Sequence, residues 1–143
     1  MQMPKFSDIK FKAVIVGAIV DNAGTLLVMT FLAAALVSTG LSEDEVMSRL
    51  KSTNGLLLGL IIGLSFTVLG GFFAGIIAGR TEVLHGALVA VVGMVLALAF
   101  REEGSPLWFD IVGLVAMLPA GMGGAYLAQK RRVDKNNQTS VSG

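Results

Sequence analysis

The sequence predicts an all-α, polytopic membrane protein whose four transmembrane helices form a compact, glycine-rich bundle. Composition is the first reason, because 54% of the 143 residues are hydrophobic, only 15% are charged and the mean hydropathy is +0.76. A chain of this size and composition cannot cover itself with polar side chains in water. The second reason is that nearly all charges fall in the gaps between long apolar runs, as a hydrocarbon core requires.

Four apolar runs are long enough, or nearly so, to cross a bilayer of about 30 Å, which takes roughly 20 helical residues. We expect transmembrane helices at 12–38, 55–79, 83–100 and 107–128, within a single transmembrane domain, 12–128. The run at 83–100 is the shortest, so it needs its flanking turns to complete the crossing.

Three segments lie outside the predicted spans. Residues 1–11 form an N-terminal segment, and residues 129–143 form a basic tail that we expect to be disordered. Between the first two spans, Ser42 and Glu45 have the spacing of a capping box. This pattern predicts a short helix over 43–51.

The lysine and arginine residues near the ends of the spans predict the orientation. Eight of them belong to the N-terminus, the turn at 80–82 and the C-terminus, whereas three belong to the other two loops. Because cytoplasmic loops carry the excess of positive charge, both termini are expected in the cytoplasm and the 43–51 helix outside it. The eight are Lys5, Lys10, Lys12, Arg80, Lys130, Arg131, Arg132 and Lys135, and the three are Arg49, Lys51 and Arg101.

Glycines recur with a spacing of four along the second run, and Thr67 interrupts the series once. In lipid, small residues at this spacing let two helix backbones approach closely, as in a glycine zipper. The row drifts by about 40° at each step, so we expect its first three members to contact one neighbour and its last three another. The second helix is therefore the predicted packing centre. The row consists of Gly55, Gly59, Gly63, Gly71, Gly75 and Gly79.

Asp21 is the only carboxylate deep inside a predicted span, about 13 Å from the Lys12 end. The residues one turn away from it on either side are small, so its side chain should point into the bundle. At the same depth in the last span, Pro119 frees the carbonyl group of Val115.

Two interpretations of Asp21 stay open. In one, the protonated side chain bonds to Thr25, Thr67 or the carbonyl freed by Pro119 and serves only to hold helices together. In the other, Asp21 and Asn22 bind a proton or a cation in a cavity at mid-membrane, as buried acids do in secondary transporters.

The turn before the third span carries three residues able to handle charge or protons. We expect Thr81 to cap the helix that follows, and Arg80 to pair with Glu82. His85, one turn further on, is interpreted as an interfacial residue, and a proton-relay role for Glu82 or His85 is the alternative.

Several classes of function are excluded by what the sequence lacks. It has no cysteine and a single histidine, so neither a thiolate site nor a multi-histidine metal site can form. No nucleophile with a base, phosphate loop or other cofactor motif is present, so we predict no enzyme and no cofactor. The basic tail is too short, and too close to a span, to indicate nucleic-acid binding.

Segments 17–31 and 86–100 share six of fifteen aligned residues. A tandem repeat of a two-helix hairpin is one interpretation, in which Asp21 faces the position equivalent to Ala90. Chance matching between two apolar segments is the other.

The motif DNAGT at 21–25, followed by GGFFAGIIAGRTEVLHGALVA at 70–90, resembles a pattern in small, uncharacterised four-helix proteins of the bacterial inner membrane. The resemblance covers about half of the chain. It implies a multi-pass protein of the bacterial inner membrane, and it implies no activity. The buried acid in the first of four helices is also similar to that of small multidrug exporters, but their acid is a glutamate in an aromatic pocket, and the first span here has no Tyr or Trp.

These observations favour a small structural or accessory protein of the lipid bilayer without catalytic activity. We expect it to associate with itself or with another membrane protein. The alternative is a small proton- or cation-coupled transporter or channel that uses Asp21.

Overall fold

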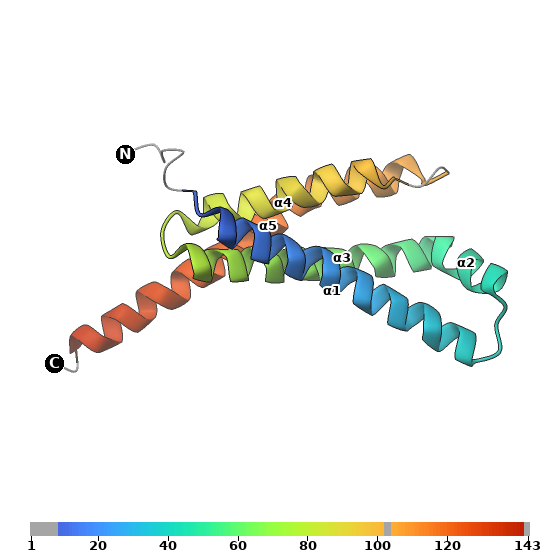
Figure 1. Cartoon of the computed structure of the whole chain (residues 1–143), viewed down its shortest axis with the longest axis horizontal. Helices are drawn as coiled ribbons and strands as arrows, with labels where there is room; N and C mark the ends of the chain where they lie inside the picture. The colour runs from blue at the N-terminus through green and yellow to red at the C-terminus, as the bar shows by residue number, and fades with distance from the viewer. Residues whose placement is uncertain (1–8, 102–103, 142–143) are drawn as a thin grey trace.

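The computed structural model describes residues 9–101 and 104–141, and every regular element in these two ranges is a helix (Figure 1). The fold class predicted from the sequence, all-α, is confirmed. Four of the helices are long and apolar enough to cross a membrane, namely α1, α3, α4 and α5. The helices are α1 (Phe11–Ser38), α2 (Glu43–Lys51), α3 (Thr53–Ala78), α4 (Glu82–Ala99) and α5 (Leu107–Val141).

Short polar residues and one glycine define the helix boundaries outside the spans. Ser42 and Glu45 form the capping box that begins α2, since the Ser42 hydroxyl accepts from the Glu45 N–H and the Glu45 carboxylate accepts from the Ser42 N–H. Ser52 ends α2 and caps α3 by accepting from the Gly55 N–H at 3.2 Å. Gly79 ends α3 with φ at 65°, a left-handed conformation that suits glycine.

The bundle has two unlike ends (Figure 1). We call the end with the start of α1, the α3–α4 turn and the last turns of α5 the closed end. We call the end with α2, the loop 39–42, and residues 100–101 and 104–106 between α4 and α5 the open end. The long helices lie together near the closed end, and α1 and α3 separate from α4 and α5 toward the open end. Helix α3 packs against all four other helices, so it is the packing centre of the bundle.

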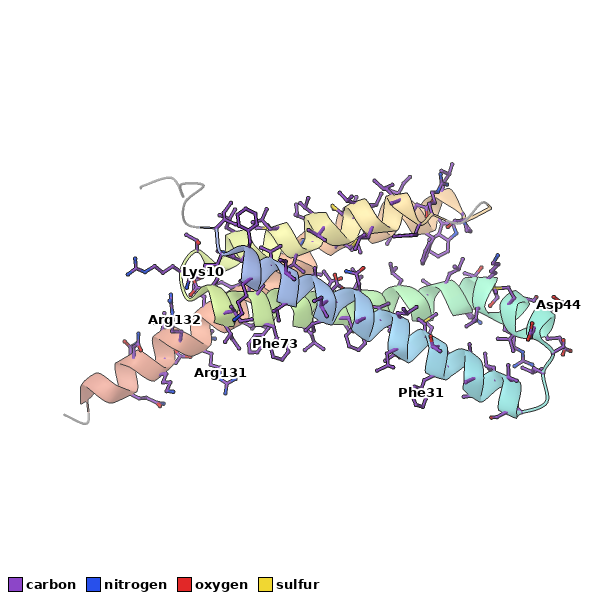
Figure 2. All side chains as sticks on the ribbon, in the orientation of Figure 1. Lys10, Phe31, Asp44, Phe73, Arg131 and Arg132 are labelled. Carbon is purple, nitrogen blue, oxygen red and sulfur yellow. The ribbon has the colours of Figure 1, made fainter. Side chains whose placement is uncertain are left out.

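The basic segment at 129–143, expected to be disordered, is helical as far as Val141, and its last two residues lie outside the described ranges. The helix starts inside the membrane span, and neither Gly nor Pro interrupts it between Ala125 and Val141. Adding a residue to an existing helix costs far less conformational entropy than starting a new helix, so the segment continues α5. Figure 2 shows Arg131 and Arg132 on this extension, at the end of the molecule opposite Asp44.

Only part of the glycine row packs helices together. Gly71 lies directly against the backbone of Gly121 on α5, and a β-carbon on Gly75 would be 2.9 Å from that of Ala128. These two glycines lie toward the closed end, where α3 and α5 are closest. Other glycines absent from the row make similar contacts, since Gly86 also meets Gly121.

The expected division of the row into two packing triplets is wrong for its remaining members. Gly55 faces the last carbonyl groups of α2, and Gly79 is the cap of α3 with no atom within 4 Å of an added β-carbon. The nearest atom to a β-carbon on Gly59 would be the Met29 methyl group at 3.7 Å, and Gly63 faces open space. For Gly59 and Gly63 the reason is the divergence of the helices, which leaves this part of α3 without a close neighbour.

Candidate functional site

Asp21 lies on the inward face of α1 and is only 3% exposed. It reaches this position because α1 and α3 are in close contact beside it, where Gly17 of α1 meets the Gly70 backbone of α3. A β-carbon on Gly70 would also be 3.0 Å from that of Asp21. Small residues around the acid, recognised in the sequence, thus bring its carboxyl group between three helices, α1, α3 and α4.

One carboxyl oxygen of Asp21 is hydrogen-bonded to Thr67 of α3. The Thr67 hydroxyl lies 3.0 Å from Asp21 Oδ1 and 3.1 Å from the carbonyl oxygen of Gly63. A hydroxyl group has one hydrogen but two lone pairs, so it satisfies both neighbours only when one of them donates to it. A neutral Asp21 meets this condition, because its O–H donates to Thr67 while Thr67 donates to Gly63. An ionised Asp21 takes the hydrogen for itself and leaves the Gly63 carbonyl without it.

The other carboxyl oxygen, Oδ2, is buried and has no hydrogen-bond partner among the described residues. It points at Gly93 of α4, where an added β-carbon would lie 3.2 Å from Oδ2 and 3.4 Å from the terminal methyl group of Met117. Gly93 therefore provides the space in which the carboxyl group approaches Met117 of α5. The neighbour of Asp21 on α4 is this glycine, one turn from the Ala90 expected from a repeat.

Three predicted members of this site do not bind the carboxyl group. The Asn22 amide donates to the carbonyl of Ala18, and the Thr25 hydroxyl donates to the backbone carbonyl of Asp21, so both side chains bond to their own helix. Pro119 lies on the exposed face of α5. It is two residues from the inward-facing Met117, and two residues on a helix point in nearly opposite directions.

A cavity of about 590 Å³ lies between α3, α4 and α5 on the open side of Asp21, with α2 at its rim. Its walls include Gly59, Leu60 and Leu64 of α3, Leu98 of α4 and Leu114 of α5. Gly59 and Gly63, the two glycines of the row that lie within α3 and lack a close neighbour, both line it.

The floor of the cavity adjoins the carboxyl group. Gly63, whose carbonyl accepts from Thr67, and Met117, whose methyl group meets Oδ2 beside Gly93, are both lining residues. Asp21 itself is not. One layer of side chains thus separates the acid from the cavity, and Thr67 connects them through hydrogen bonds.

The rim of the cavity is polar. Arg101 donates to the Asp110 carboxylate at 2.7 Å, and the Ser105 hydroxyl donates to the second oxygen of Asp110 at 3.0 Å. Lys51 of α2 also lines the rim. Charged groups therefore occur where the bundle meets the membrane surface, and apolar groups line the depth.

At the closed end, His85 is fully buried in the first turn of α4. Its Nε2 accepts from the backbone N–H of Lys10 at 2.9 Å, and its Nδ1 lies 3.0 Å from the Thr81 carbonyl. Because Nε2 accepts, the ring is neutral and carries its hydrogen on Nδ1, which donates to Thr81. His85 thus holds the start of α1 against the first turn of α4.

The pair expected between Arg80 and Glu82 is replaced by a contact between distant elements. Glu82 is 3% exposed, and its Oε1 lies 2.6 Å from Nη2 of Arg132 on the α5 extension, an ion pair by distance. The expected cap is also absent, because Thr81 adopts a left-handed conformation with φ at 49° and its hydroxyl donates to the Arg80 carbonyl. The helical extension of α5, which the sequence did not predict, brings Arg132 within reach.

Comparison of the chain with family models, with curated proteins and with solved structures finds no match. The candidate site therefore has to be interpreted from its own geometry.

Proposed function

We propose that this chain is a small proton-coupled transporter without catalytic activity, in which Asp21 binds and releases a proton below the cavity. The observation that carries the proposal is the buried Asp21 carboxyl group, with Oδ2 unpaired and Oδ1 linked through Thr67 to Gly63 at the cavity floor. A side chain used only to join helices is expected to have its buried polar atoms paired, because each unpaired one costs about 1–3 kcal/mol. The unpaired oxygen favours a group whose protonation changes during function.

The hydrogen bonds suggest how protonation is felt at the cavity. When Asp21 is neutral, Thr67 donates to the Gly63 carbonyl; when Asp21 is ionised, Thr67 turns its hydrogen toward Oδ1. The Gly63 carbonyl then keeps its helical bond from the Thr67 N–H but has one lone pair free, which can accept from water or from a polar group of a bound molecule. Loss of the proton thereby changes the polarity of the cavity floor.

The difference between the two ends of the bundle is more consistent with a transporter than with a channel. The open end has a cavity, whereas at the closed end Gly71 and Gly86 both lie against Gly121, which brings the backbones of α3, α4 and α5 together. A channel needs a continuous path, but a transporter needs access from one side at a time. The buried contacts of His85 and Glu82 hold the closed end together.

For the orientation, we propose the bacterial inner membrane with both termini in the cytoplasm, so that the cavity opens to the outside. The support is the excess of Lys and Arg at the closed end, together with the sequence resemblance to bacterial inner-membrane proteins.

The test is an infrared titration of the protein reconstituted in lipid, because a neutral carboxylic acid has its own C=O stretching band. We expect a band that disappears as the pH is raised and that is missing in Asp21→Asn, which keeps the shape of the side chain but cannot ionise. Asp134→Asn, the same change on the exposed extension of α5, is the matched control and should leave the band unchanged. The Asp21 band could instead persist at every pH at which the protein stays folded. Asp21 would then remain neutral and serve only in helix packing, and the proposal would be overturned.

A further inference from the structure

The shape of the cavity indicates what kind of molecule fits it. Its lining runs from Leu56 to Leu64 on α3 and from Phe109 to Met117 on α5. At 1.5 Å per residue, each of these stretches is about 12 Å long. Half of a hydrocarbon core of about 30 Å is about 15 Å. The cavity is therefore a slot nearly as deep as one leaflet of the membrane.

The chemistry of the slot changes along its depth. Its polar side chains are Lys51, Arg101, Ser105 and Asp110, and all of them belong to the rim. From Leu60 inward the lining consists of aliphatic side chains, methionine and glycine. A sugar, a nucleotide or a hydrated ion would lose hydrogen bonds to water in this part of the slot without replacement. An apolar chain would lose none, and a polar head would meet the charged and hydroxyl groups of the rim.

The walls are adaptable, as a flexible ligand requires. Met29, Met47 and Met117 come from three different helices and line the slot near its side, its rim and its floor. Methionine has an unbranched, polarisable side chain that adjusts to irregular partners.

The slot also has a side through which a lipid could enter. Helix α1 contributes Met29 alone to the lining, and its second half runs away from α4 (Figure 1). Phe31 of that half is 72% exposed and points away from the bundle (Figure 2). Between α3 and α4 the slot is thus not covered by α1, and the surrounding solvent at that depth is lipid.

From these observations we propose that the slot binds an amphiphile with an apolar chain, whose chain end lies on Gly63 and Met117 and whose polar head lies at the Arg101–Asp110 pair. The proposal names the substrate class for the proposed transporter and rests on that function. A free fatty acid and a membrane phospholipid share this chemistry. In either case the chain end would lie one side chain away from Asp21.

The experiment uses two photoactivatable probes, a fatty acid and a phospholipid, each with a diazirine at the end of the chain. They are added to the full-length protein in nanodiscs, and the labelled peptides are identified by mass spectrometry. We expect labelling on 56–64 and 110–117 that unlabelled amphiphile suppresses by competition. Unlabelled fatty acid and unlabelled phospholipid are compared as competitors. The one that suppresses labelling at the lower concentration identifies which of the two lipids the slot prefers.

Two tryptophan variants provide the matched comparison. An added β-carbon meets no atom within 4 Å at either Gly63 or Gly123, but Gly63 lines the slot, whereas Gly123 is exposed on α5 away from it. Gly63→Trp should reduce the competed labelling by about tenfold, which corresponds to about 1.4 kcal/mol of binding free energy. Gly123→Trp should leave it unchanged.

The outcomes separate this inference from the proposed function. Equal labelling of wild type and Gly63→Trp, or labelling spread over the exposed faces of all spans without competition, would overturn the binding site. Crosslinks between two copies of the chain at 56–64 would assign the slot to a partner helix and overturn it as well. Competed labelling that survives in Asp21→Asn supports the slot even where the infrared titration fails, and a titrating Asp21 without competed labelling supports the proton site alone.

Discussion

The two halves of α3 use the same residue type for opposite purposes. Toward the closed end, Gly71 lets α3 and α5 touch backbone to backbone at Gly121. Eight residues earlier, Gly63 faces open space and leaves room for a cavity. A glycine spacing of four therefore indicates close packing only where a neighbouring helix follows the row, and here α5 follows it at Gly71 and Gly75.

The largest expected effect tests this difference directly. Gly71→Leu should destabilise the protein by about 3 kcal/mol or more, because the new side chain enters the space of the Gly121 backbone. Gly63→Leu should change stability little or raise it by roughly 0.5–1 kcal/mol, since leucine favours the helix over glycine and meets open space. Unfolding in detergent micelles, followed by circular dichroism, measures both. Equal losses at the two positions would mean that the row packs along its whole length.

An intermediate effect is expected at the hydroxyl that connects Asp21 with the cavity. Thr67→Val keeps the shape of the side chain but leaves a buried oxygen of Asp21 without its hydrogen-bond partner, which should cost about 1–3 kcal/mol. Thr30→Val is the matched control, because the Thr30 hydroxyl bonds to the Leu26 carbonyl at an exposed position. Its loss should cost less than about 0.5 kcal/mol. The same unfolding assay compares the two, and equal costs would argue against a special role of the Asp21–Thr67 bond.

The smallest effect concerns the open end, where α2 lies at the rim. Hydrogen bonds from the Ser42 backbone N–H and hydroxyl lower the pKa of Glu45 below its usual value. A carboxyl group with a lowered pKa stabilises the folded form above its unfolded pKa of about 4.3, and this contribution is lost as the pH falls through the lowered value. Acidification should therefore fray the first turn of α2, and the resulting fall in the protection factor of the Ser42 amide, the exchange rate of an unstructured peptide divided by that of this amide at the same pH, can be followed by nuclear magnetic resonance.

The control for this prediction is Glu45→Gln, which keeps a hydrogen-bond acceptor but cannot be protonated in this range. The protection factor of the Ser42 amide should then be independent of pH. If acid lowers the protection factor equally in both proteins, the capping box is not what holds the start of α2.

Hydrophobicity and charge alone locate the spans, because a run of about 20 mostly apolar residues favours the hydrocarbon core whatever its tertiary neighbours are. The same holds for the cap of α2, whose bonds join residues three apart. The inward direction of Asp21 was also recognisable, since the small residues one turn away from it mark a packed helix face. Thr67 was recognised as one of its candidate partners.

Other features depend on where helices stand relative to each other, and only the tertiary structure decided them. Glu82 pairs with Arg132, fifty residues away, because α5 continues past the membrane; Gly93 and Met117 enclose Asp21 because α4 and α5 meet there. Pro119 is not part of the site, because the rotation of α5 about its own axis places this residue on the exposed face. The cavity itself follows from the divergence of the helices. The sequence pattern of one helix determines how deep each residue lies in the membrane and which face is apolar. It does not determine the distance to a neighbouring helix, because that distance depends on how all four helices pack together.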